Sequence, residues 1–197
     1  MPSLVANRLA KTVSILTNPA LLVSFTTLVV IYHYAHNPRE FWLGSVIGII
    51  LLIGPGLVYS INLWRQEGYV DLDISNRQER IVPLMLTCLG AVIGTYLVQS
   101  RLGDPKFVEI GYILVTLLTA TTIITTVWKI SLHAITLSAL VTLLVIFRGE
   151  TFGLGYLVLI PIAWSRLYLK QHTQTQLVAG TLLGIILTAL AAWLFKF

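Results

Sequence analysis

The sequence predicts an all-α membrane protein, a polytopic helix bundle with about six to seven transmembrane helices. Of its 197 residues, 56% are hydrophobic and only 11% are charged, whereas an average soluble domain has about 25% charged residues. Such a chain could not cover a water-facing surface. Several apolar runs also approach the roughly 20 residues that cross about 30 Å of hydrocarbon as a helix. We therefore expect one integral membrane domain over residues 1–197.

Apolar runs separated by polar or turn-forming residues are the candidate spans. They cover residues 20–35, 41–63, 81–100, 107–127, 132–147, 152–164 and 177–195. One separator, Thr126–His133, has no Gly or Pro, although a helix from 107 to 147 would be much longer than the bilayer is thick. The chain must therefore reverse near Lys129. Irregular backbone at that depth is tolerated where protein or a water-filled cavity satisfies it, so the junction indicates a site; ordinary loop geometry is the alternative.

Residues 1–18 are expected to form an N-terminal helix that lies in the membrane interface. Apolar side chains recur there at helical spacing, at Val5, Leu9, Val13 and Leu16. Arg8 and Lys11 fall elsewhere on the helical wheel, as in an interfacial amphipathic helix. Asn18 and Pro19 suit the cap and first turn of the next helix.

Charge and cysteine content restrict the partners. The formal net charge is +5, but the basic residues are scattered through short loops with no Lys/Arg run that could follow a phosphate backbone. No nucleic-acid partner is therefore expected. The single cysteine, Cys88, excludes an intramolecular disulfide and a Cys-based metal site. We expect a multi-pass protein of the cell (plasma or inner) membrane in contact with membrane lipids, with its oligomeric state and orientation left open.

Seven spans would bring the N-terminus, the 64–80 loop, the 128–131 junction and the 165–176 segment to one membrane face. That face gathers two histidines and several cations, including Arg77, Arg80, Lys129, His133, Arg166 and His172. Ionisable residues at membrane depth are functional candidates by default. Two histidines among cations do not make a zinc site, which needs three or four ligands. The chemistry fits an anion, and phosphate best.

Two short motifs on this face resemble a known family. Ser165-Arg166, then five residues, then His172 resembles the third signature of the type 2 phosphatidic acid phosphatases, the membrane lipid phosphate phosphatases. Ser131 and His133 keep the Ser and the His of that family's second signature, Pro-Ser-Gly-His. The resemblance covers residues 128–184 approximately. The first signature, a Lys six residues before an Arg-Pro pair, has no match here.

The resemblance implies a divergent lipid phosphatase that acts on phosphatidate, phosphatidylglycerophosphate or a prenyl diphosphate. His172 would attack phosphorus to form a phosphohistidine, and His133 would protonate the leaving oxygen and later activate water. Cations and hydroxyls of the same face would hold the phosphoryl oxygens, namely Arg166, Lys129, Arg77 or Arg80, Ser131 and Ser165. No metal and no cofactor takes part in this scheme.

Gln176 stands where that family has an acidic residue, four positions after the second histidine. Positions 172 and 176 share one helical face, so the amide can reach the His172 ring and fix its tautomer and orientation. An amide supplies no charge, however, to stabilise the positive ring that forms when the histidine bonds phosphorus. We therefore expect a catalytic role for Gln176 in orientation, with a slower transfer step.

Two other functions remain open. The polar loop residues Asn62, Asp71, Asp73 and Glu79 loosely resemble the acidic motifs with which membrane prenyltransferases hold diphosphate through magnesium. The third class is a non-catalytic phospholipid-binding relative. Each site residue also has a structural alternative: Arg166 and His172 as an interfacial pair that snorkels to headgroups, Lys129 as a span cap, and Arg77 with Arg80 as a solvated loop.

Overall fold

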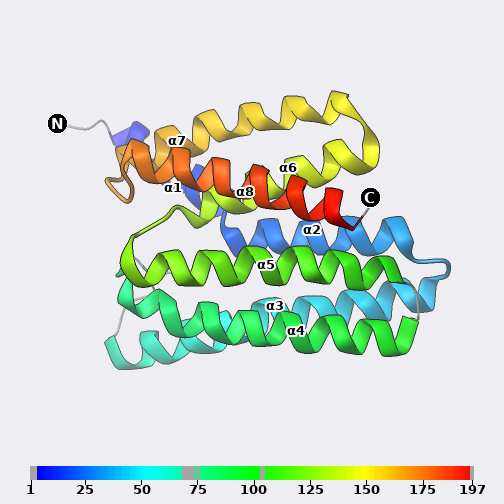
Figure 1. The fold of residues 1–197 in the computed structure, drawn as a ribbon. Helices are drawn as coiled ribbons and strands as arrows, with labels where there is room; N and C mark the ends of the chain where they lie inside the picture. Colours follow the sequence, from blue (N-terminus) through cyan, green and yellow to red (C-terminus); the bar gives the residue numbers. More distant parts are fainter. Residues whose placement is uncertain (1–3, 68–73, 75, 103–104, 196–197) are drawn as a thin grey trace. The chain divides into compact units, whose positions relative to one another are not determined.

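Figure 1 shows the computed structural model of the protein, which describes residues 4–67, 74, 76–102 and 105–195. Every regular element within these residues is helical. Five helical stretches there are long and apolar enough to cross a membrane: Leu4–Tyr34, Pro38–Tyr59, Gln78–Leu102, Lys106–Val127 and Gln174–Leu194. The shorter apolar helix Leu132–Arg148 accompanies them. The predicted fold class, an all-α membrane bundle, is therefore confirmed.

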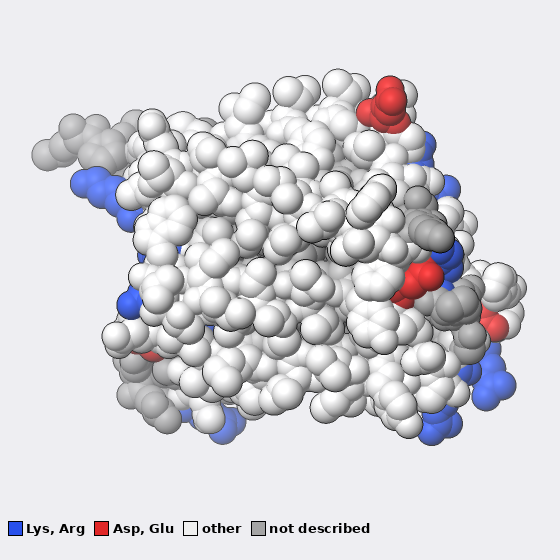
Figure 2. Space-filling view, in the orientation of Figure 1, with Lys and Arg blue, Asp and Glu red and all other residues white. Residues whose placement is uncertain are grey.

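The helix surfaces are those expected in lipid. Figure 2 shows uncharged helix flanks as a broad white surface, with coloured Lys, Arg, Asp and Glu side chains at helix ends. Large apolar side chains such as Leu154 and Trp193 are more than 70% exposed. Exposing apolar area to water costs about 25 cal/mol per Å², and hydrocarbon around the helices removes that cost.

The chain packs as two compact units. Unit 1 comprises Met1–Val23 and Lys129–Phe197, and unit 2 comprises Ser24–Trp128. Hydropathy shows which segments are buried in lipid but not which segments pack together, so the sequence did not predict these units. The expectation of one membrane domain over residues 1–197 stays a prediction.

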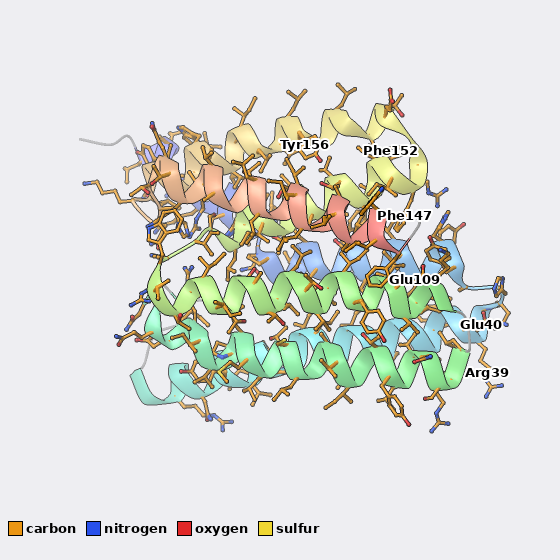
Figure 3. The ribbon with its side chains drawn as sticks, viewed as in Figure 1. Arg39, Glu40, Glu109, Phe147, Phe152 and Tyr156 are labelled. Carbon is orange, nitrogen blue, oxygen red and sulfur yellow. The ribbon has the colours of Figure 1, made fainter. Side chains whose placement is uncertain are left out.

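Unit 2 contains most of α2 together with four further elements. The elements are α2 (Pro19–Tyr34), α3 (Pro38–Glu67), η1 (Gln78–Arg80), α4 (Ile81–Leu102) and α5 (Pro105–Val127). Helix α4 packs against both α3 and α5. Gly90 lies so close to α3 that an added Cβ would meet the Leu51 carbonyl carbon at 3.0 Å. At the start of α3, Glu40 accepts the His36 backbone N–H at 2.8 Å, at the helix end labelled in Figure 3.

Unit 1 is built on a helical hairpin. Its elements are α1 (Leu4–Leu16), α6 (Leu132–Arg148), η2 (Glu150–Val158), α7 (Leu159–Tyr168) and α8 (Gln174–Leu194). Helix α6 packs against η2 and α7, which together form the return limb. Gly149 makes the turn at a φ of 104°, a conformation that L side chains rarely adopt. The hydroxyls of Thr142 and Tyr156 lie 2.8 Å apart and join α6 to η2, where Figure 3 labels Tyr156.

The return limb begins as a 3-10 helix and becomes α-helical at Leu159. Pro161 has no backbone N–H to donate to the carbonyl of Leu157, so an α-helical bond is lost at this point. The predicted span 152–164 is therefore a 3-10 segment followed by the short helix α7. Its end brings Ser165 and Arg166 back toward the beginning of α6.

Helices α6 and α8 run in the same direction and touch through two glycines. A Cβ added at Gly180 would lie 2.9 Å from the Ser131 carbonyl oxygen, and one at Gly184 would lie 2.6 Å from the Ile135 carbonyl oxygen. From Gly180 to Gly184 on α8, the contact moves from Ser131 to Ile135 on α6. Both steps are four residues forward along the chain, so the two helices are parallel. The N-terminal ends of α6 and α8 consequently lie at the same end of unit 1.

We predict that Gly184→Ala destabilises the protein, because its methyl group would meet the rigid α6 backbone. Such overpacking costs about 1–3 kcal/mol. The matched control is Gly56→Ala in α3, where the nearest atom, Thr87 Oγ1, is 4.0 Å from the added Cβ. This control should be neutral or stabilising by up to about 1 kcal/mol. Thermal unfolding in detergent measures both, and equal midpoints would contradict the close α6–α8 contact.

Candidate active site

The two segments with the predicted histidines are capped helix starts. Ser131 is the N-cap of α6, with extended backbone (φ −85°, ψ 106°), and its Oγ accepts the Ala134 N–H at 3.4 Å. Thr173 is the N-cap of α8, and its Oγ1 accepts the Gln176 N–H at 3.3 Å. Helix N-termini present free N–H groups and the positive end of the helix dipole. Both starts therefore favour a negative group nearby.

Gln176 holds the ring of His172. Its Oε1 lies 3.0 Å from His172 Nδ1 and also accepts the backbone N–H of Thr173 at 3.2 Å. An atom that accepts a backbone N–H is the amide oxygen, and an oxygen can only accept from the ring. Nδ1 therefore has the proton, and the neutral ring has its lone pair on Nε2. The contact expected from the four-residue spacing is present.

A tight turn connects the signature Arg to the signature His. The carbonyl oxygen of Arg166 accepts the backbone N–H of Gln171 at 2.9 Å and that of His172 at 3.4 Å. Lys170 has a φ of 54°, the left-handed conformation that reverses a chain after a helix. Two residues six positions apart in the motif are thus joined directly through the backbone.

Helix α1 contacts three of the predicted site residues. Ser165 donates its hydroxyl to the Ala10 carbonyl oxygen at 2.7 Å, and Arg166 Nη1 donates to Ser14 Oγ at 2.5 Å. His133 Nε2 lies 3.2 Å from the Ser14 carbonyl oxygen. Ser165 and Arg166 are both 0% exposed. The structure therefore brings Ser165, Arg166 and His133 together around one face of α1.

Ala10 and Ser14 were not among the predicted site residues, because the apolar stripe of α1 indicated only an interfacial helix. The available signal was the pair of small residues four apart, Ala10 and Ser14, since small residues at this spacing let helices approach closely. Both are buried, whereas Val5, Leu9 and Leu16 of the apolar stripe are exposed. The interfacial position of α1 stays a prediction.

Lys129 lies in the non-helical connection between α5, which ends at Val127, and α6, which begins at Leu132. Its side chain is half-buried. The departure from helical geometry predicted near Lys129 is therefore confirmed, and its role as a phosphate ligand stays a prediction.

Arg77 and Arg80 belong to unit 2, where both bind backbone carbonyls. Arg77 Nη1 donates to the carbonyl oxygen of Thr125 at 2.9 Å and to that of Thr126, in the last turn of α5. A cation that binds these terminal carbonyls caps the helix. Arg80 is buried, and its Nε donates to the Ile74 carbonyl oxygen at 2.5 Å. Their participation in phosphate binding stays a prediction, like the other assigned roles.

Two of the four residues of the alternative metal site, Asn62 and Glu79, lie within the described residues. Asp71 and Asp73 lie outside the described residues. Glu79 accepts a hydrogen bond from the Asn76 side chain, and Asn62 is exposed on α3. Within the described ranges, no group of three or more His, Cys, Asp or Glu residues is placed to hold a metal ion.

Comparison with known proteins covers the histidine segments. Residues 117–197 match the family model of the PAP2 superfamily. The match includes both histidines, Arg166 and Gln176, so the resemblance to type 2 phosphatidic acid phosphatases is confirmed there. The match suggests phosphatase-type activity on phosphoesters. No curated protein and no solved structure matched the chain.

The hydrogen bonds around His172 predict which ring nitrogen has the proton, and ¹⁵N NMR can measure this. Wild-type His172 should have its proton on Nδ1 and an unprotonated Nε2, visible in ¹⁵N NMR at neutral pH, with His172→Ala used for assignment. Gln176→Leu removes the acceptor and should give the mixed tautomers of a free imidazole. Gln174→Leu, an exposed position on the same turn, is the control. A protonated Nε2 in the neutral wild-type ring would contradict the assigned hydrogen bonds.

Proposed function

We propose that the protein is a membrane-embedded lipid phosphatase of the cell (plasma or inner) membrane. Its substrate would be a lipid phosphomonoester or diphosphate such as phosphatidate, phosphatidylglycerophosphate or a prenyl diphosphate. The PAP2 match over residues 117–197 and the apolar helices support this proposal. The observation on which it depends most is the contact of 3.0 Å between His172 Nδ1 and Gln176 Oε1.

A nucleophilic histidine needs a lone pair on the nitrogen that attacks and a support behind the other nitrogen. His172 has this arrangement, because Gln176 accepts from Nδ1 and leaves the lone pair on Nε2. The support is itself fixed, since the Thr173 backbone N–H donates to the same amide oxygen. The ring is thus oriented before substrate binds, which removes part of the entropic cost of reaction.

The proposed reaction has two displacement steps. His172 Nε2 attacks phosphorus, the bond from phosphorus to the lipid oxygen breaks, and the imidazolium form of His133 protonates that oxygen. His133 then takes a proton from water, whose oxygen attacks phosphorus as the bond to His172 breaks, and inorganic phosphate leaves. Arg166 and Lys129 would stabilise the charge on the equatorial oxygens.

Gln176 sets the expected speed of this reaction. When His172 bonds phosphorus the ring becomes positive, and a carboxylate at position 176 would stabilise that charge more than an amide dipole does. The helix itself does not require the amide, because the capping box at Thr173 and Gln176 accepts Glu as readily as Gln. Position 176 therefore offers a substitution that changes charge with little change in shape.

A non-catalytic phospholipid-binding relative is the second candidate. The neutral Gln176 favours it, because binding a phosphate headgroup needs the cations but not a stabilised phosphohistidine. It differs from the first candidate in one measurable respect: it predicts saturable lipid binding without release of phosphate.

We predict that Gln176→Glu raises the rate of phosphate release. Replacing an oriented dipole by a charge beside the reacting ring is worth about 1–3 kcal/mol, or roughly tenfold to a hundredfold in rate. His172→Ala should abolish release in both the wild-type and the Gln176→Glu background. Phosphate release by the purified protein would be measured with each lipid in micelles containing a chelator. The matched control is Gln174→Glu, which adds the same charge at an exposed position of the same turn.

The outcomes separate the candidates. Wild-type activity retained in His172→Ala would remove His172 as nucleophile. Lipid binding with no phosphate release by any variant, Gln176→Glu included, would favour the phospholipid-binding relative. Turnover of a prenyl diphosphate that requires magnesium and transfers the prenyl group would instead identify the prenyltransferase.

A further inference from the structure

We propose that α1 is an internal ligand of the candidate phosphoryl site and must leave it before a substrate can bind. Oxygen atoms of α1 occupy the hydrogen-bond donors that phosphoryl oxygens would use. This inference rests on the proposed function and adds a closed state to it. Helix α1 lies outside the PAP2 match, which begins at residue 117.

Three oxygens of two residues one helical turn apart, Ala10 and Ser14, meet three different donors. The Ala10 carbonyl oxygen accepts from Ser165, Ser14 Oγ accepts from Arg166, and the Ser14 carbonyl oxygen meets His133. A phosphoryl group likewise presents three terminal oxygens to a ring of donors. Helix α1 therefore offers the site the same kind of acceptors as the substrate proposed for it.

Two of these bonds exclude a substrate bond to the same proton. Ser165 has one hydroxyl proton, and the Ala10 carbonyl receives it at 2.7 Å. A carbonyl oxygen can only accept, so the contact at 3.2 Å requires the His133 proton on Nε2 to point at Ser14. The proton that a leaving oxygen would take from Nε2 is thus directed at α1 instead.

The burial of the site side chains also indicates that α1 must move before a substrate can bind. Ser131, Ser165 and Arg166 are 0% exposed, and His133 and His172 are 3% and 7% exposed. A phosphorylated headgroup cannot reach side chains that are covered to this degree. Helix α1 contributes to the cover, because its buried residues Ala10 and Ser14 are the ones that contact the site.

Helix α1 can separate from the rest of the chain at a defined break. It ends at Leu16, and α2 begins at Pro19 with the Ala20 N–H bound to Asn18 Oδ1 at 2.9 Å. The start of α2 is therefore capped independently of α1. A released α1 would find a favourable place in the interface, because its exposed face is apolar and is flanked by the exposed Arg8 and Lys11.

The first test is Ser14→Ala, which removes the oxygen that Arg166 binds and preserves the helix. If α1 competes with substrate, weakening its bond raises the fraction of open protein, and the KM for phosphatidate should fall roughly threefold to tenfold. Thr12→Ala, which removes an exposed hydroxyl from the same helix, should leave KM unchanged. An unchanged or higher KM in Ser14→Ala would overturn the inference. A lower kcat would also overturn it, because Ser14 would then be a positioning residue.

The second test follows α1 directly by cysteine labelling. Ala10→Cys, in a Cys88→Ser background, places a thiol at a position that is 0% exposed with α1 docked. Vanadate, used as the phosphate analogue, should accelerate its labelling at least threefold and leave Thr12→Cys unchanged. Vanadate that inhibits phosphate release without changing the labelling of Ala10→Cys would overturn the inference alone. A protein that neither releases phosphate nor binds vanadate would overturn the proposed function as well.

Discussion

Hydrogen bonding in hydrocarbon is the constraint on which this structure depends. An unsatisfied backbone group costs several kcal/mol in lipid, so the chain is helical wherever it can be. The hydroxyls in the helices follow the same rule, since Thr95, Thr122 and Thr142 each donate to the carbonyl four residues earlier at 2.7 Å. Non-helical backbone then needs side-chain caps. The predicted histidines lie beside two such capped breaks, which connects the membrane constraint to the position of the site.

The burial of Arg166 is the second constraint. Moving a guanidinium from water into a low-dielectric interior costs several kcal/mol unless polar groups surround it. The Ser14 hydroxyl supplies one such group, and the neighbouring Ser165 donates to the Ala10 carbonyl oxygen one turn earlier on α1. A phosphoryl anion would compensate this charge better than a hydroxyl does, because a hydrogen bond between two charged groups is stronger than one with a neutral acceptor. The docked helix and the bound anion are therefore alternative solutions to the same electrostatic problem.

The sequence predicted those features that depend on local spacing. Hydropathy located the spans, bilayer thickness required the break near Lys129, and the four-residue interval predicted the contact between Gln176 and His172. Contacts between distant segments were not predictable. Ser14 contacts His133 and Arg166, which lie 119 and 152 residues later in the sequence. The only sequence signal for these contacts is the pair of small residues Ala10 and Ser14 on α1. Arg77 is a predicted phosphate ligand because a cation's charge is visible in the sequence, whereas its hydrogen bond to an α5 carbonyl was not predictable. Its role at phosphate stays a prediction.

In the proposed mechanism, position 176 would set the balance between holding a phosphate and transferring it. An amide orients the ring of His172 and adds no negative charge to the site, which would favour a bound anion. A carboxylate would compensate part of that charge and so weaken binding of the anion, yet it would stabilise the positive ring that forms in the transfer step. The same substitution thus lowers affinity and raises rate. On the proposed function, this opposition would make a phosphatase and a phospholipid-binding protein two outcomes of one arrangement of His172, Gln176 and Arg166, with the charge at position 176 deciding between them.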